Sequence, residues 1–189
     1  IEKMTKYLDK FEYGLAKIAF EEFFWADFCD NYLELVKLRL YKPELFENGE
    51  EKKLAWQWTL YHVLFDTLKL IAPYLPHITE EIYQNYFKQY ENIISIHKTE
   101  FPTQILEINN QTELIKEFEK IKEIIESVRK FKTENQISMW AELKSLDIHW
   151  SKEFLEIARK YLDDIIWVTK AQKVDLIESH EENFICSKL

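Results

Sequence analysis

The chain has 189 residues, of which 47% are hydrophobic and 31% charged, so it can fill a core and cover it with polar side chains. Its formal net charge of −9 disfavours non-specific binding to nucleic acids or anionic membranes, because the long-range field repels polyanions. Only two glycines and four prolines occur, which disfavours a β-sandwich or barrel and favours long helices.

Apolar residues recur at helical offsets from the start of the chain, and Phe11 is one of them. We predict that this helical stretch breaks within residues 9–14, because Gly14 is unfavourable inside a helix. A long helix then covers residues 15–41 and ends before Pro43. The Asn48-Gly49 turn lies in the loop that follows.

The middle of the chain reads as two further helices and an extended stretch. A second long helix covers residues 52–72 and is stopped by Pro73. A third begins near Thr79, whose following acids suit a helix start, and reaches about position 90. Residues 93–102 then read as an extended crossing segment.

The last third changes character. A clear amphipathic helix covers residues 111–134, and residues 143–150 alternate apolar and polar side chains, as a strand does. Ser151 suits the N-cap of a helix that runs to about position 167, and residues 173–177 form a short strand candidate. We therefore expect a mainly α fold, with an antiparallel helical bundle over residues 1–137 and a small mixed α/β region over 138–189. The final residues, SHEENFICSKL, read as truncated.

Cysteine use and hydropathy set further limits. Cys29 and Cys186 lie far apart in no metal-like spacing, which predicts two free thiols in an intracellular protein. No apolar run approaches the roughly 20 residues that a membrane span needs. Because the first residues already read as helical sequence, we expect the chain to be part of a longer polypeptide.

The stretch FFWADFCDNYLELVKLRL, residues 23–40, is the most distinctive in the chain. On a helical wheel most of its aromatics, Trp25 among them, fall in one broad arc that suits the core of a bundle. Phe23 is the exception and lies among charged residues. The carboxylates Asp27, Asp30 and Glu34 read as a solvated face, since nothing in the sequence shows convergent partners or burial.

Signs of catalytic chemistry are weak. His62 and Asp66 have the spacing of metal ligands on a helix, but no third ligand completes a set, so we predict no metal site. Glycine-rich phosphate loops and nucleophile motifs do not occur. We therefore predict no catalytic residues in this chain.

Basic residues are the better candidates for binding. Lys6 and Lys10 share one helical face with Lys3, and Lys17 lies close by in sequence. Tyr13 lies at the predicted break, where its ring could stack on an unpaired base while the lysines contact phosphates. Arg129, Lys130 and Lys132 cluster near a helix C-terminus. An ordinary lysine-rich surface, and cations favoured by the helix dipole, explain the same residues.

Four segments resemble a known family. FEEFFWADFCDNYLELVKLRLY resembles the FFW-x-x-FCD-x-Y-x-E segment of valyl-tRNA synthetases, and LKLIAPYLPHITEEIYQ resembles a segment that they share with the isoleucine and leucine enzymes. ISIHKTEFP and VRKFKTENQIS resemble two further segments of this family in the same order. Three positions depart from it: Asn31 and Phe101 stand where Trp is common, and Lys132 where Arg is common.

The resemblance implies a C-terminal anticodon-binding domain of a valyl-tRNA synthetase, a class I aminoacyl-tRNA synthetase. Its partners would be tRNA(Val) and the catalytic and editing domains upstream in the same polypeptide, with no DNA or membrane. ATP would bind in the absent catalytic domain, no cofactor would bind in this chain, and the location would be cytoplasmic. The expected tRNA-binding residues are Lys6, Lys10, Tyr13, Lys17, Arg129 and Lys132.

Other interpretations remain at this point. The chain could be a non-catalytic helical module that binds a protein partner through Phe23 and its aromatic faces. It could also be the equivalent domain of an isoleucyl- or leucyl-tRNA synthetase. A metal-dependent hydrolase on a helical bundle is a further alternative.

Overall fold

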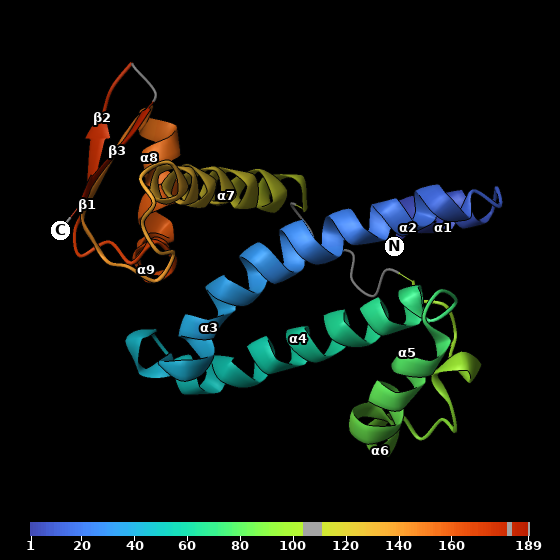
Figure 1. Ribbon diagram of the computed structural model, residues 1–189. Coiled ribbons are helices and arrows are strands. Elements are labelled where there is room, and N and C mark those ends of the chain that lie inside the picture. Colours follow the sequence, from blue (N-terminus) through green and yellow to red (C-terminus); the bar gives the residue numbers. More distant parts are fainter. Residues whose placement is uncertain (104–110, 181–182, 189) are drawn as a thin grey trace. The chain divides into compact units, whose positions relative to one another are not determined.

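A computed structural model describes residues 1–103, 111–180 and 183–188 (Figure 1). The fold is mainly helical, with a small three-stranded sheet near the C-terminus, which confirms the predicted fold class. The chain divides into two compact units, residues 1–107 and 108–189.

The first unit is built from helices. Its α-helices are α1 (Glu2–Leu8), α2 (Tyr13–Glu21), α3 (Leu33–Tyr41), α4 (Gly49–Ile71), α5 (Pro76–Ile82) and α6 (Lys88–Glu91). The π-helical segments η1 (Glu22–Tyr32) and η3 (Tyr83–Phe87) continue α2 and α5, and the 3-10 turns η2 (Pro43–Leu45) and η4 (Ile96–Lys98) lie in the connections. The predicted helices are therefore present, but Thr79 lies inside α5, which begins at Pro76. The predicted extended segment carries the turn η4.

Helices α3 and α4 lie side by side as a hairpin (Figure 1). Its turn is held by the Arg39 guanidinium, which lies 5.8 Å from the ring centroid of Phe46 and 5.9 Å from that of Trp56. Gly49 begins α4 where the chain passes very close to Pro43. A Cβ added at Gly49 would lie 1.8 Å from the Pro43 carbonyl oxygen, so this turn requires glycine for space.

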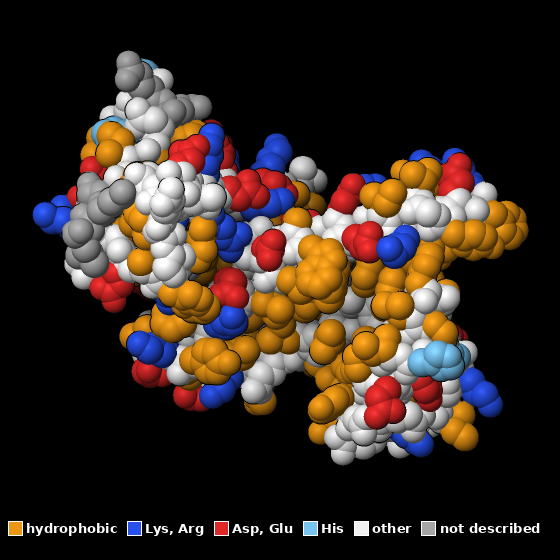
Figure 2. Space-filling model, viewed as in Figure 1, with side chains coloured by type: hydrophobic (Ala, Val, Ile, Leu, Met, Phe, Trp, Pro, Cys, Tyr) orange, Lys and Arg blue, Asp and Glu red, His pale blue; other side chains and the backbone are white. Residues whose placement is uncertain are grey.

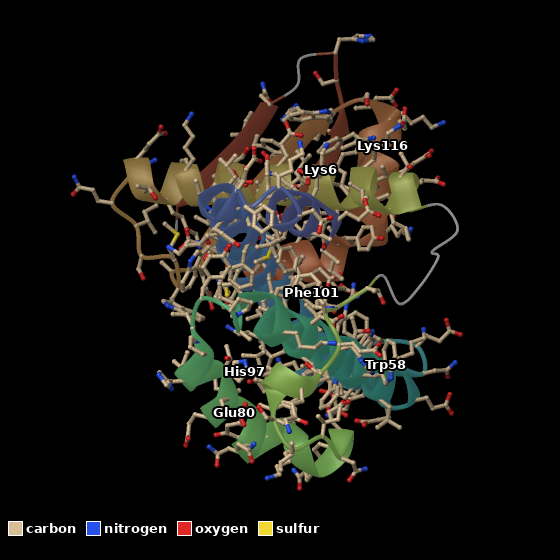
Figure 3. All side chains as sticks on the ribbon, turned by 90° about the vertical axis from the view of Figure 1, so that its right-hand side faces the viewer. Lys6, Trp58, Glu80, His97, Phe101 and Lys116 are labelled. Carbon is tan, nitrogen blue, oxygen red and sulfur yellow. The ribbon has the colours of Figure 1, made fainter. Side chains whose placement is uncertain are left out.

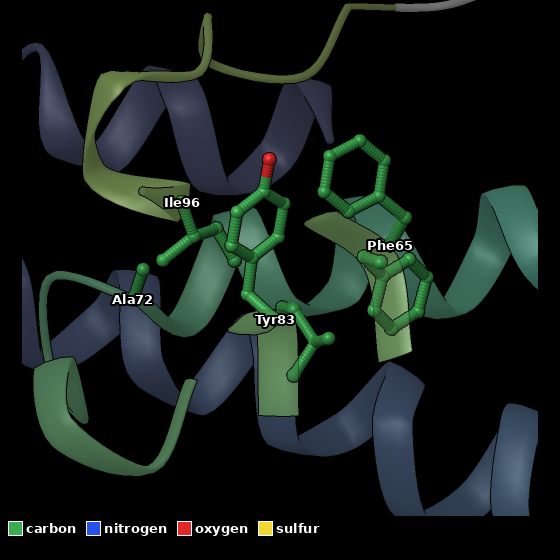
Figure 4. Close-up of a cluster of buried hydrophobic side chains, with 6 residues drawn as sticks. Phe65, Ala72, Tyr83 and Ile96 are labelled. Carbon is green, nitrogen blue, oxygen red and sulfur yellow. The ribbon is translucent and has the colours of Figure 1, made fainter. Parts of the chain in front are cut away.

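One core of the first unit forms where α4, α5 and η3 meet the segment that leads into η4 (Figure 4). Phe65 of α4 stacks on Tyr83, with ring centroids 6.0 Å apart, and Ile96 and Ala72 are buried beside them. The buried Tyr83 hydroxyl donates a hydrogen bond of 2.8 Å to the Ile93 carbonyl, which satisfies it without water. A second cluster of buried residues joins α1, α2 and α4: Met4, Ala16, Phe20, Leu70 and Ile71.

The distinctive aromatic stretch falls largely in the π-helical segment η1. Phe28 is buried, as predicted, but Trp25 is 59% exposed, so its assignment to the core was wrong. A π-helix has i→i+5 hydrogen bonds, so a wheel drawn with α-helical spacing misplaces its side chains. Phe23 is 40% exposed and its ring stacks against Phe28 at 6.2 Å, while the buried Asn31 amide donates to the Ala26 carbonyl at 2.7 Å.

The second unit packs helices against a sheet. Its elements are α7 (Gln111–Glu134), β1 (Leu143–Trp150), α8 (Lys152–Lys160), α9 (Leu162–Thr169), β2 (Val174–Glu178) and β3 (Asn183–Lys188). The strand order is β2-β1-β3, with β2 parallel and β3 antiparallel to β1. The predicted β-α-β arrangement is present, although a break at Tyr161 divides its helix into α8 and α9.

Two features of this unit differ from the sequence expectation. Strand β3 lies in the final residues that read as truncated, and it pairs with β1 along residues 183–188. Helix α7 contacts α8, α9 and β3, so it belongs with the sheet, although the sequence placed residues 111–134 in the bundle. The chain divides into its compact units between positions 107 and 108, whereas the sequence placed a domain boundary at 137/138.

Candidate nucleic-acid interface

The turn between α1 and α2 is the first part of the candidate site. The Glu12 amide donates to the Tyr7 carbonyl and the Phe11 amide to the Leu8 carbonyl, both at 2.9 Å, which is the hydrogen-bond pattern of a Schellman C-cap. Phe11 occupies the left-handed position of this cap, with φ 59°, where glycine is usual. The break lies within the predicted range, but Gly14 lies inside α2 and does not cause it.

Two aromatic rings project from this turn. Phe11 is 76% exposed and Tyr13 is 55% exposed, and their rings pack edge to face with centroids 6.3 Å apart. The Tyr74 hydroxyl donates a hydrogen bond of 2.7 Å to the Tyr13 carbonyl, which fixes the backbone beneath the exposed rings. The outward position predicted for Tyr13 is therefore observed, whereas Phe11 was wrongly expected on the apolar face of a helix.

The nearby lysines differ in how they are engaged. Lys6 and Lys10 are exposed, and among the described residues no ion pair involves either of them. Lys17 pairs with Glu21 at 2.9 Å, and Lys3 pairs with Glu22 at 2.7 Å. Exposed pairs of this kind are weak and exchange partners readily. Lys6 and Lys10 are therefore the cations most available to a phosphate.

A cleft of about 610 Å³ lies beside these lysines, between α1 and residues 101–103. Lys6 and Lys10 line it together with Phe101, which is 39% exposed, and Figure 3 labels Lys6 and Phe101. In the sequence, Phe101 stands out only as a departure from the family pattern. Its position directly before Pro102 in the crossing segment was the signal that could have placed it at a surface.

The charges over this region are mixed. Figure 2 shows lysine and acidic side chains interspersed with hydrophobic ones over α1 and α2. Glu2 and Asp9 also line the cleft. A polyanion at this end of the unit would therefore be bound by a few individual side chains and not by a broad positive field. This agrees with the negative net charge of the chain.

Lys132 was predicted to contact tRNA, and the structure places it in the protein interior. Its side chain is buried, and its ammonium donates to the carbonyls of Met139, Ala141 and Thr169 at 3.0, 2.7 and 2.9 Å. Burial lowers the pKa of Lys132, and the charge of Lys170 lowers it further. A lysine with all three donors satisfied inside the protein is not available to a nucleic acid.

The sequence carried a signal for this burial. Lys132 continues the spacing of the buried stripe on α7, which consists of Ile121, Ile125 and Val128. Arg129 lies on the neighbouring face, is half-buried and already makes an interaction within the protein. The structure therefore does not bring Arg129 and Lys132 together as an exposed basic pair.

Two of the family-like segments meet in one hydrogen-bonded cluster. Ser95 donates its hydroxyl to the Glu80 carboxylate at 2.8 Å, and the Ile96 amide donates to the same oxygen at 3.1 Å. The ring nitrogen Nε2 of His97 lies 3.1 Å from the Pro76 carbonyl oxygen. Burial raises the pKa of Glu80, but the hydrogen bonds from Gln84, Ser95 and Ile96 outweigh it, and the pKa lies below its usual value. This cluster fastens the crossing segment to α5 and is structural.

The candidate metal ligands have other roles. Asp66 pairs with Lys69 at 2.7 Å, and the His62 ring lies 4.1 Å from that of Trp58. Within the described residues, no group of three or more His, Cys, Asp and Glu side chains is placed to hold a metal ion. None of the helices in the described ranges is both long and apolar enough to cross a membrane.

Comparison with known proteins matches residues 1–147 to the family described as the anticodon-binding domain of tRNA ligase. The chain is 35% identical to a valine–tRNA ligase of Methanopyrus kandleri over 179 residues and 31% identical to that of Thermococcus kodakarensis over 182 residues. It is 37% identical to the valine–tRNA ligase of Rickettsia rickettsii over 174 residues. These matches cover 93%, 96% and 92% of the chain but only 19%, 20% and 20% of the relatives.

Proposed function

The chain belongs to the family of anticodon-binding domains of tRNA ligases, and from this premise we propose that it binds the anticodon region of a tRNA. The observation that carries the proposal is the turn after α1. There the exposed rings of Phe11 and Tyr13 lie on the same helix hairpin as the available cations Lys6 and Lys10. Aromatic rings stack on unpaired bases, and lysines neutralise the flanking phosphates.

The identity of the tRNA is a finer part of the proposal. We propose tRNA(Val), because the relatives that match along nearly the whole chain are valine–tRNA ligases. The chain spans about a fifth of their length. We further propose that it acts beside catalytic and editing domains of the same polypeptide, which would use ATP to attach valine to tRNA in the cytoplasm.

Binding by the 189-residue chain should be weak and strongly dependent on salt, because the net charge is −9. Filter binding of valine tRNA at low and moderate salt tests this, with single changes in the anticodon as competitors. Equal affinity for every anticodon variant would exclude specific recognition. Lack of binding at both salt concentrations would exclude the function.

Charge-removing variants test where the tRNA binds. The double variant Lys6→Ala/Lys10→Ala should reduce the slope of log affinity against log salt by about 0.7 for each lost contact to single-stranded RNA. Lys52 and Lys116 are also exposed lysines, and Lys52→Ala/Lys116→Ala is the matched control. An equal loss in both double variants would show that only overall charge matters.

A second candidate function is a protein-interaction module. It is favoured by large exposed apolar side chains on the first unit, where Leu54 is 72%, Trp58 48% and Tyr90 66% exposed. Titration with tRNA while tryptophan and tyrosine fluorescence is recorded separates the two functions. A response that saturates and weakens with salt supports tRNA binding, whereas no response favours a protein partner.

A further inference from the structure

We propose that the exposed half of an apolar stripe on α4 docks a basic amphipathic helix of a separate protein. The stripe consists of Leu54, Trp58, Tyr61 and Phe65, which recur at spacings of four and three residues on one face of the helix. It lies outside the lining of the cleft between α1 and residues 101–103. The inference therefore goes beyond tRNA binding and concerns a different surface of the first unit.

Only one half of this stripe is covered within the first unit. Phe65 is buried and its ring stacks on that of Phe87, with centroids 5.2 Å apart. Tyr61 lies at the border, where its ring centroid is 5.0 Å from that of Phe87 and 6.0 Å from that of Tyr90. Beyond this border Trp58 is 48% exposed, although it continues the same face (Figure 3). Elements η3 and α6 therefore cover one half of the stripe and leave the other half open to a partner.

The charges at the two ends of the open half favour a basic partner. Glu51 is exposed and continues the stripe by one further step of three residues. Glu91 lies at the other end, where its carboxylate accepts a hydrogen bond of 2.7 Å from the Tyr61 hydroxyl. Lys52 and Lys53 fall on other faces of α4 at helical spacing. Carboxylates thus border the open face, and the net charge of −9 attracts cationic partners from a distance.

The open half is aromatic, and its rings have polar tips. The Trp58 ring lies 4.1 Å from that of His62, which lies 5.4 Å from that of Tyr61, so these rings and Tyr90 form one continuous surface. Tryptophan and tyrosine are enriched in interfaces between separate proteins, and their faces attract lysine and arginine. Permanent interfaces are more hydrophobic. A partner that binds and dissociates therefore fits this surface better than a permanently packed domain.

The shape of the stripe indicates what the partner presents. Apolar residues at spacings of three and four on one helix are the groove-side counterpart of an amphipathic helix that carries the same spacing. Leu54 is 72% exposed and supplies an aliphatic contact beside Trp58. Lysine or arginine side chains that flank the partner's apolar stripe would then meet Glu51 and Glu91.

Two synthetic peptides test the charge preference. Both are amphipathic helices of about 18 residues with the same leucine stripe, and the other positions are lysine in one peptide and glutamate in the other. The full 189-residue chain is titrated into each fluorescent peptide, and polarisation is recorded. We expect the lysine peptide to bind at least about 10-fold more tightly, because like charges at an interface are repelled. Equal affinities for the two peptides would overturn the proposal.

Aromatic and aliphatic variants test where the lysine peptide binds. Trp58→Ala should weaken its binding about 10-fold, because a central tryptophan carries a large share of the energy of an interface. Trp140→Ala removes a tryptophan that is 74% exposed in the second unit, and it should leave the affinity unchanged. Leu54→Gln is a milder change on the same stripe and should weaken binding about threefold. Circular dichroism checks that each variant is folded. Equal affinities of Trp58→Ala and Trp140→Ala would overturn the site.

A matched pair of charge reversals separates local from overall charge. Glu51→Lys should weaken binding of the lysine peptide about fivefold, because an attraction at the end of the stripe becomes a repulsion. Glu113→Lys makes the same change in net charge at an exposed position on α7, and it should have little effect. Equal losses in the two variants would show that only net charge attracts the peptide and would overturn the proposed site.

Other occupants of the stripe give different results. If a second copy of the chain covers it, sedimentation shows a dimer that Trp58→Ala dissociates, and the proposal fails. If RNA covers it, Trp58→Ala weakens tRNA binding and leaves the affinity for the lysine peptide unchanged, which also overturns it. Weaker peptide binding with unchanged tRNA binding supports the proposal. Absence of tRNA binding by the parent chain would overturn the proposed function alone.

Discussion

Replacing Lys132 by Met tests whether the buried ammonium holds the second unit together. Methionine keeps the length of the side chain but removes the donors to Met139, Ala141 and Thr169. Because Lys132 is only 2% exposed, water does not replace these hydrogen bonds. The three carbonyls come from the loop before β1 and from the end of α9, so the substitution disconnects α7 from both.

The expected loss follows from opposing terms. A hydrogen bond to a charged group contributes roughly 1.5–3 kcal/mol, so three bonds together contribute about 5–9 kcal/mol. Removing a buried ammonium relieves a desolvation penalty of several kcal/mol. We therefore expect Lys132→Met to lower the free energy of unfolding by about 3 kcal/mol. Lys130, the exposed neighbour on α7, provides the control Lys130→Met, which should change it by less than about 0.5 kcal/mol.

Urea unfolding followed by circular dichroism and tryptophan fluorescence measures this change. A loss below about 0.5 kcal/mol for Lys132→Met would refute the argument from the three hydrogen bonds. The parent chain should also become more stable as pH rises through the window between the lowered pKa of Lys132 and its ordinary value of 10.5, because the unfolded state binds more protons there. Lys132→Met should lack this rise. At low temperature, its folded form should bind tRNA as the parent does.

Three further predictions concern the first unit. Phe11→Gly should raise the free energy of unfolding by about 1 kcal/mol in urea unfolding, because it removes a bulky side chain from a left-handed backbone position. The same variant should weaken tRNA binding. A fall in stability would contradict the idea that Phe11 is strained in this position. Gly49→Ala should destabilise the protein by about 2 kcal/mol or more in the same assay, because its Cβ would clash with Pro43. Gly14→Ala should stabilise the protein by about 0.5–1 kcal/mol, because the space around its Cβ is open. Equal effects of the two substitutions would exclude the steric explanation. Because the pKa of Glu80 is lowered in the folded state, its ionised carboxylate stabilises the fold at pH values above the usual carboxyl pKa. This stabilisation is lost as pH falls through the pKa of the folded state. The melting temperature should therefore fall less on acidification in Glu80→Gln than in the parent.

The helices were predictable because apolar side chains recur at helical spacing, and the strand β1 because they alternate. Strand β3 was not predictable from its own residues. It is an edge strand of six residues, and its partner β1 lies more than thirty residues earlier, so pairing across the sheet decides its structure. Trp25 was wrongly predicted to be buried for a related reason. The local sequence does not indicate that its helix changes to i→i+5 hydrogen bonding.

The candidate site was predictable only in part. The exposed positions of Lys6, Lys10 and Tyr13 were predictable, because they follow from local rules of spacing and breaks. Phe101 was not assigned to the site, because it is 91 residues from Lys10 and only the fold brings the two to one cleft. The burial of Lys132 follows from its position on the apolar stripe of α7, which its charge alone does not reveal.

The contact between Glu80 and Ser95 has a consequence for comparing sequences of this family. The two residues are fifteen positions apart in segments that look like independent motifs, yet one carboxylate oxygen accepts from both the Ser95 hydroxyl and the Ile96 amide. A substitution at either position changes how much the residue at the other position contributes to stability, so the pair should co-vary among relatives. For the same reason, the effects of single and double substitutions on stability should be non-additive. Agreement at both positions thus counts as one shared structural feature and not as two separate signs of a common RNA target.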